Sequence, residues 1–119
     1  MLHEFGVAVR HQPGLAVLDM RGEINGFASQ ELSAAYSEAE SQNPPTVVLN
    51  FSQVSYINST GIALIVGLLA RARQAQRRLA VYGLSDHYQE IFQITRLVDF
   101  MTIYTDEVSL LKDPQIQNV

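Results

Sequence analysis

The sequence predicts an α/β domain in which about four helices cover a mixed five-stranded sheet. An apolar alternation over residues 5–10 is joined through Pro13-Gly14 to a second apolar run, which indicates an antiparallel hairpin. A helical pattern then separates this hairpin from the short apolar run 47–51, as in a parallel crossover unit. Two further strands alternate with three more helices, so the predicted order is β-β-α-β-α-β-α-β-α.

The first strands and helix follow from local patterns. Strands are expected at residues 5–10 and 15–20, and the second is expected to end at a loop, because residues 22–26 hold two glycines and an asparagine. A helix should run from about Phe27 to a stop before Asn43-Pro44-Pro45. Its buried face is predicted to carry the residues at helical spacing, Leu32, Ala35, Tyr36 and Ala39.

The middle of the chain is predicted to form the core. Residues 47–51 are typical of a strand buried on both faces, with a loop over 52–58 after it. The longest helical pattern spans about residues 60–76 and is apolar nearly all round in its first half. Its end is basic, and we expect a solvated helix end there, formed by Arg71, Arg73, Arg77 and Arg78.

The last elements are shorter. A strand at 79–82 precedes a helix that Asp86 and Gln89 are predicted to cap. Residues 102–104 predict the fifth strand, and Asp106-Glu107 opens a final helix through Leu111. Three aromatic residues at core spacing are expected to pack inside, namely Tyr36, Tyr88 and Phe92, whereas His87 is expected at the surface. The prediction is one domain over residues 1–119, with its core at about 5–112 and a frayed tail at 113–119.

Composition excludes several functions. The 119 residues suffice for one domain, and the absence of cysteine excludes a disulfide scaffold or thiolate metal site. The histidines are scattered, so no metal or other cofactor is expected, and the net charge of −4 argues against nucleic acid. The apolar run 62–70 is too short to cross a membrane, for which about twenty residues are needed. No export signal is visible, so we expect a cytoplasmic protein without membrane insertion.

Motifs for catalysis are missing. The chain has no phosphate-binding loop, no G-x-S-x-G elbow and no H-E-x-x-H pair. A response-regulator receiver would need a phosphorylatable aspartate at the end of the central strand, where this chain has Asn50. We therefore expect no enzymatic activity, and the missing phosphate loop and base–nucleophile pair argue against a small nucleotide-binding or nucleotide-hydrolysing enzyme.

One tetrapeptide could carry chemistry, Asn58-Ser59-Thr60-Gly61 at the start of the apolar helix. Ser59 is the expected N-cap, with Thr60 the first helical residue and Gly61 allowing close packing. One interpretation of the tetrapeptide is a structural cap only. Alternatively, a hydroxyl here receives a phosphoryl group, because the positive end of a helix tolerates a phosphate dianion.

The segment VVLNFSQVSYINSTGIALI, residues 47–65, resembles the signature of STAS domains, and specifically of bacterial anti-sigma factor antagonists. Those proteins have a hydrophobic strand, Asp-Leu-Ser, then Asp-Ser-Ser/Thr-Gly-Leu/Ile and a long apolar helix. The loop at residues 22–25 is similar to the family's Gly-Glu-Leu/Ile-Asp, and residues 79–85, 91–92 and 97–104 match its C-terminal half in order and spacing. The resemblance implies the STAS fold.

The resemblance also implies a partner switch. Ser59 takes the position of the phosphorylated hydroxyl, with Thr60 as the second hydroxyl. The unmodified protein would bind an anti-sigma factor that is itself a serine kinase of the histidine-kinase-like ATPase type, and the phosphorylated form would be released. A PP2C-type phosphatase would reset it. The expected partner-binding rim beside the motif consists of Gly22, Glu23, Ile24, Asn25, Ile57 and Ile62.

Three asparagines replace the family's acidic residues: Asn25, Asn50 and Asn58. They remove negative charge from the expected rim while keeping a hydrogen-bond acceptor. Arg96 stands where many family members have glycine, and we expect it at the surface. The alternative function is a non-switching STAS interaction subunit of a stressosome-type assembly or a lipid-transport ABC complex, in which Ser59 would belong to a fixed interface.

Overall fold

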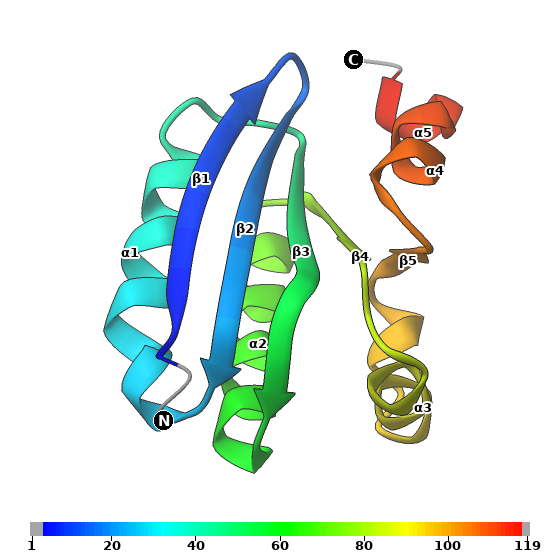
Figure 1. Cartoon of the computed structure of the whole chain (residues 1–119). Helices are drawn as coiled ribbons and strands as arrows, with labels where there is room; N and C mark the ends of the chain where they lie inside the picture. The colour runs from blue at the N-terminus through cyan, green and yellow to red at the C-terminus, as the bar shows by residue number, and fades with distance from the viewer. Residues whose placement is uncertain (1–3, 118–119) are drawn as a thin grey trace.

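The structure, a computed structural model, describes residues 4–117 and confirms the predicted fold class (Figure 1). The strand order is β1-β2-β3-β4-β5, with β1 antiparallel to β2 and the other neighbours parallel. The strands are β1 (Gly6–Gln12), β2 (Leu15–Ile24), β3 (Thr46–Ile57), β4 (Arg78–Tyr82) and β5 (Thr102–Tyr104). The helices are α1 (Ser29–Glu40), α2 (Ser59–Gln74), α3 (Asp86–Ile94), α4 (Glu107–Lys112) and α5 (Pro114–Gln117), with 3₁₀ turns at Gly26–Ala28 and Leu97–Asp99.

The predicted hairpin is present. Pro13 and Gly14 separate the paired residues Gln12 and Leu15, and Gly14 has a positive φ of 81°. A left-handed residue after proline is what a tight turn of this kind requires, and glycine adopts that conformation without strain.

β2 and β3 extend further than predicted. Residues 22–24 and 52–57 were expected in loops, but they pair with each other up to Ile24 beside Ile57, with register shifts along the way. Ser52, Gln53 and Ser55 are exposed in this extension. The strand therefore lacks the apolar pattern that identifies a buried strand, because one face of the sheet is not covered there.

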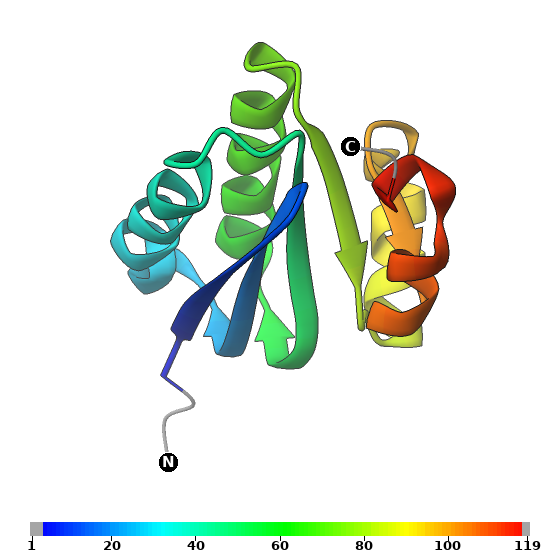
Figure 2. The same cartoon turned by 90° about the horizontal axis from the view of Figure 1, so that it is seen from above.

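Helices lie on both faces of the sheet (Figure 2). The side chains of α1, α2 and α3 pack with Val47 and Leu49 in the larger core, whereas Val48 points to the opposite face. On that face, Leu110 of α4 and Ile116 of α5 cover the apolar end of the sheet. The central strand is thus buried on both sides, as predicted.

The C-terminus and one helix cap differ from the prediction. The tail was expected to fray from residue 113, but Pro114–Gln117 forms a helix and Ile116 is buried; residues 118–119 lie outside the described part. Helix α3 is capped by Ser85, whose hydroxyl accepts from the Tyr88 N–H, and not by Asp86. Asp106 caps α4 as predicted.

The basic end of α2 is less solvated than expected. Arg71 donates to Glu40 at 2.9 Å and lies 4.6 Å from the ring centroid of Tyr36. Arg77 is mostly buried and donates to the Pro44 carbonyl oxygen at 2.7 Å. These arginines therefore join α2 to the end of α1.

The expected burial or exposure of five further residues is confirmed. Tyr36, Tyr88 and Phe92 are buried, whereas His87 and Arg96 are exposed. Arg96 has a φ of 65°, which explains why glycine suits this position. Within residues 4–117, no helix has the length and apolar character needed to cross a membrane.

Candidate functional site

The candidate site is the turn in which β3 ends and α2 begins, which we call the Ser59 turn (residues 57–62). Its N-cap is Asn58 and not the expected Ser59: the Asn58 side-chain oxygen accepts from the Gly61 N–H at 2.8 Å. The backbone oxygen of Asn58 accepts from the Ile62 N–H at 2.9 Å. Ser59 is therefore the first helical residue, and its side chain is not used for capping.

The end of β2 holds the Ser59 turn in place. The Asn58 N–H donates to the Ile24 carbonyl oxygen at 3.2 Å. A Cβ on Gly61 would lie 2.8 Å from the Ile24 carbonyl carbon, closer than any side chain tolerates, so this position requires glycine. The Ile57 N–H donates to the hydroxyl of Tyr88 at 2.8 Å. These contacts fix the backbone on which Ser59 is presented.

Ser59 and Thr60 are exposed. Within the described part of the chain, the Ser59 hydroxyl has no hydrogen-bond partner, and the N–H groups of Ser59 and Thr60 are also unpaired. An exposed hydroxyl beside two free amide donors can receive a phosphoryl group, and the helix dipole would favour the resulting dianion.

The expected rim divides into accessible and buried residues. Ile24 and Ile57 are 0% and 5% exposed, so they support the Ser59 turn from below and cannot contact a partner, contrary to the prediction. Glu23, Asn25 and Ile62 are partly exposed and lie around the turn. The remaining rim residue, Gly22, has a positive φ of 82° within β2.

Sequence reasoning missed Phe27. It was expected near the start of an amphipathic helix, but it lies in the 3₁₀ turn Gly26–Ala28 and is 97% exposed. A Cβ on Gly26 would lie 3.6 Å from the methyl group of Thr60, so this turn abuts the start of α2. Asn25 caps the turn, because its side-chain oxygen accepts from the Phe27 N–H at 2.9 Å. The helical spacing of the buried face, Leu32, Ala35, Tyr36 and Ala39, does not include Phe27, and this was the available signal for its exposure.

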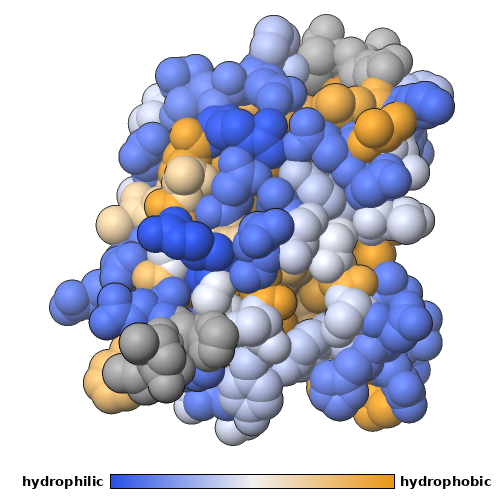
Figure 3. All heavy atoms as spheres, in the orientation of Figure 1, coloured by the Kyte–Doolittle hydropathy of each residue, from blue (hydrophilic) through white to orange (hydrophobic). Residues whose placement is uncertain are grey.

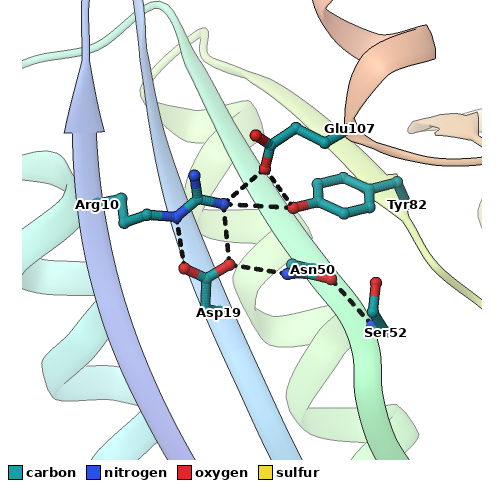
Figure 4. Close-up of polar contacts among 6 residues, drawn as sticks. All are labelled: Arg10, Asp19, Asn50, Ser52, Tyr82 and Glu107. Carbon is teal, nitrogen blue, oxygen red and sulfur yellow. Dashed lines mark hydrogen bonds and ion pairs between the residues drawn. The ribbon is translucent and has the colours of Figure 1, made fainter.

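A second polar group lies on the sheet face opposite α2 (Figure 4). This charged cluster comprises Arg10, Asp19, Asn50, Tyr82 and Glu107. The Arg10 guanidinium donates to Asp19 at 2.5 and 3.0 Å and to Glu107 at 2.7 Å. Tyr82 also donates to Glu107, at 2.7 Å. In Figure 3, hydrophilic residues lie across the middle of this face.

The charged cluster is internally satisfied. Burial raises the pKa of the Asp19 carboxyl, but hydrogen bonds from Arg10 and Asn50 outweigh this and hold the pKa below its ordinary value. The hydrogen bond from Arg10, with a second from Tyr82, lowers the pKa of Glu107. Both carboxylates are thus ionised and paired at neutral pH, which makes the cluster a link between β1, β2, β4 and α4.

Asn50 belongs to this cluster and not to the Ser59 turn. Its amide donates to the Asp19 carboxylate at 2.8 Å, and its side-chain oxygen accepts from the Ser52 N–H at 2.9 Å. The expected loss of rim charge at Asn50 is therefore wrong, because its side chain faces the other side of the sheet. Among residues 4–117, no group of three or more metal-ligating side chains could hold a metal ion.

A family model described as the STAS domain matches residues 6–110. The anti-sigma-B factor antagonist of Listeria monocytogenes is 32% identical over 69% of this chain and 72% of its own length.

Two solved structures share the fold. An anti-sigma factor antagonist from Mycobacterium paratuberculosis has a TM-score of 0.80 at 18% identity, over 96% of this chain and 95% of its own. The Bacillus cell fate determinant SpoIIAA in its phosphorylated form has a TM-score of 0.68 at 22% identity, over 88% and 96% of the two chains.

Proposed function

The chain belongs to the STAS domain family of bacterial anti-sigma factor antagonists, and we propose from this that it is a partner-switching regulator controlled by phosphorylation of Ser59. Unmodified, it binds an anti-sigma factor that is a serine kinase of the histidine-kinase-like ATPase type. The phosphorylated form is released from this partner. A PP2C-type phosphatase hydrolyses the phosphoserine and restores binding.

The observation that carries the proposal is the free hydroxyl of Ser59 in a fixed and exposed turn. In the transfer, Ser59 Oγ forms a bond to the γ-phosphorus of ATP, the bond to the ADP oxygen breaks, and a base of the kinase takes the hydroxyl proton. The kinase supplies nucleotide and magnesium, so this chain acts as substrate and ligand.

Asn58 is compatible with this role although the family's residue is acidic. Its side-chain oxygen makes the capping bond to the Gly61 N–H that a carboxylate would make. The cap keeps Ser59 at the first helical position, where its hydroxyl stays free. The acceptor geometry therefore does not depend on a negative charge at Asn58.

Phosphorylation adds negative charge to a segment that has no formal charge of its own and that lies near Glu23. No residue from 41 to 70 carries a formal charge, so the added −1.5 to −2 charges, roughly, meet no cation there. The free N–H groups of Ser59 and Thr60 stabilise the dianion in the isolated protein. A partner that covers the turn must remove the water around the phosphate without supplying an equal counter-charge. This desolvation weakens the complex.

The test is phosphorylation by purified kinases. The chain is incubated with each histidine-kinase-like serine kinase of the same genome, with ATP and magnesium, and its intact mass is measured. We expect one added phosphate in the wild type and in Thr60→Ala, and none in Ser59→Ala. Phosphate that persists in Ser59→Ala would overturn the assignment. Partner binding that is unchanged in Ser59→Asp would instead favour the non-switching interaction subunit.

A further inference from the structure

Phe27 is the most exposed large hydrophobic residue of the described chain. The residue is 97% accessible, compared with 72% for Ile94 and 60% for Val108. A benzyl group in water contributes nothing to the core, and an exposed aromatic side chain of this kind is characteristic of protein interfaces. The ring therefore needs an explanation outside the fold.

The backbone beneath the ring is fixed. The Phe27 N–H is bonded to the Asn25 side chain at 2.9 Å, and the Ala28 N–H is bonded to the Asn25 carbonyl oxygen at 3.0 Å. Ala28 itself is fully buried. Only the side-chain rotamer of Phe27 remains free, so burying the ring in a partner would cost little conformational entropy.

Phe27 lies at the same end of the sheet as Ser59. Figure 1 shows the end of β2 and the starts of α1 and α2 together at this end. Gly26 approaches the methyl group of Thr60, and Ile24 bonds to Asn58. The ring and the acceptor hydroxyl are therefore carried by two turns that contact each other.

The neighbouring surface of α2 is uncharged and made of small residues. Ala63 is exposed, Val66 is 43% exposed, and the space around Gly67 is open. A groove of about 230 Å³ separates this part of α2 from α1, and its lining is mostly apolar, with two serines of α1 and Arg71 as its polar part. A partner that fits against Ala63, Val66 and Gly67 therefore presents an apolar surface there.

We propose that Phe27 is the anchor by which this chain docks on its anti-sigma factor, inserting into an apolar pocket of that protein, with Ala63 and Val66 in the adjoining contact. The inference rests on the proposed function and names the residue that supplies its binding energy. It also explains release of the anti-sigma factor. The surface around Phe27 must lose its water when the ring is buried, and a phosphate on Ser59 would place an unpaired dianion at the edge of this surface.

The test measures affinity for the serine kinase that phosphorylates the chain, by titration calorimetry with the unmodified protein. Phe27→Ser should raise Kd at least about 30-fold, as truncation of an aromatic hot spot does. Ala63→Glu should weaken binding as well, because it places a charge in the apolar contact. The matched control Ile94→Ser removes another exposed apolar side chain, on α3, and should change Kd less than about two-fold. All three variants should keep the wild-type melting temperature.

Two failures have different meanings. If the kinase binds the wild type and Phe27→Ser with equal Kd, Phe27 is not an anchor and this inference is overturned while the proposed function stands. If no serine kinase of the genome binds the wild type, the proposed function is overturned, and this inference with it.

Discussion

Gly61 and Gly67 lie six residues apart in α2, and the structure predicts opposite effects when each is replaced by alanine. In a helix interior, alanine is more favourable than glycine by about 1 kcal/mol. Around Gly67 there is nothing within 4 Å that a new methyl group would meet. Gly67→Ala should therefore stabilise the protein by about 0.5–1 kcal/mol.

At Gly61 the same change has no room. The new Cβ would lie 2.8 Å from the Ile24 carbonyl carbon and 2.9 Å from Cγ2 of Ile57, whereas ordinary carbon contacts are about 3.5–4.0 Å. The contacted atom of Ile24 belongs to the backbone of a paired strand and cannot move easily. The first turn of α2 must therefore move away by several tenths of an ångström. Overpacking of this kind costs about 1–3 kcal/mol, and the hydrogen bond from Asn58 to Ile24 would weaken as well.

We expect Gly61→Ala to lower the free energy of unfolding by about 2 kcal/mol net of the helix propensity gain. Urea unfolding at neutral pH, followed by circular dichroism, measures both variants against the wild type. Phosphorylation of Ser59 should also slow in Gly61→Ala, because the turn that presents the hydroxyl is displaced. A Gly61→Ala protein as stable as Gly67→Ala would refute the claim that this close approach fixes the Ser59 turn.

Three further substitutions test the cap and the charged cluster by urea unfolding. Asn58→Ala should lose about 1 kcal/mol with the capping bond, whereas Asn58→Asp should equal or exceed the wild type, because its carboxylate also caps and faces the helix dipole. Asn50→Asp should lose about 2 kcal/mol at pH 7, because it turns a hydrogen-bond donor to Asp19 into a second carboxylate. Glu107→Gln should lose about 0.5–1 kcal/mol, since the ion pair with Arg10 is partly exposed.

The pH dependence of these effects has a defined sign. The folded-state pKa of Glu107 is lowered, so its contribution is complete above the unfolded-state pKa of about 4 and is lost as the pH falls further. The difference between wild type and Glu107→Gln should therefore shrink in acid. The two carboxylates of Asn50→Asp raise each other's pKa, so its deficit should shrink already near pH 5. An Asn50→Asp deficit independent of pH, or an Asn58→Asp protein as unstable as Asn58→Ala, would contradict the assigned contacts.

The sequence predicted the element order because its signals are local. The hairpin follows from Pro13-Gly14, and the buried central strand follows from an apolar run between turn residues. The same local reasoning ended β2 and β3 too early. The last residues of β2 and β3 include serines and a glycine, and one face of the sheet is uncovered there, so their composition resembles that of a loop. Only the pairing up to Ile24 and Ile57 shows that they form strands.

The site was predictable in outline but not in its chemistry. Asn58 and Ser59 are both good N-caps, and the choice depends on the bond from Asn58 to Ile24, thirty-four positions earlier in the chain. The residues of the charged cluster lie on four strands and α4, so no local sequence pattern predicts the cluster. Phe27 was placed only at the approximate start of the first predicted helix, and its exposure depends on the 3₁₀ turn Gly26–Ala28 to which it belongs.

The most direct measurement of the central claim compares two preparations of the same chain, unmodified and stoichiometrically phosphorylated at Ser59, in binding to the serine kinase that modifies it. Because the dianion must lose water without a counter-charge, Kd should rise about 100-fold or more on phosphorylation, and phosphatase treatment should restore it. Equal affinity of the two preparations would show that Ser59 does not control partner binding.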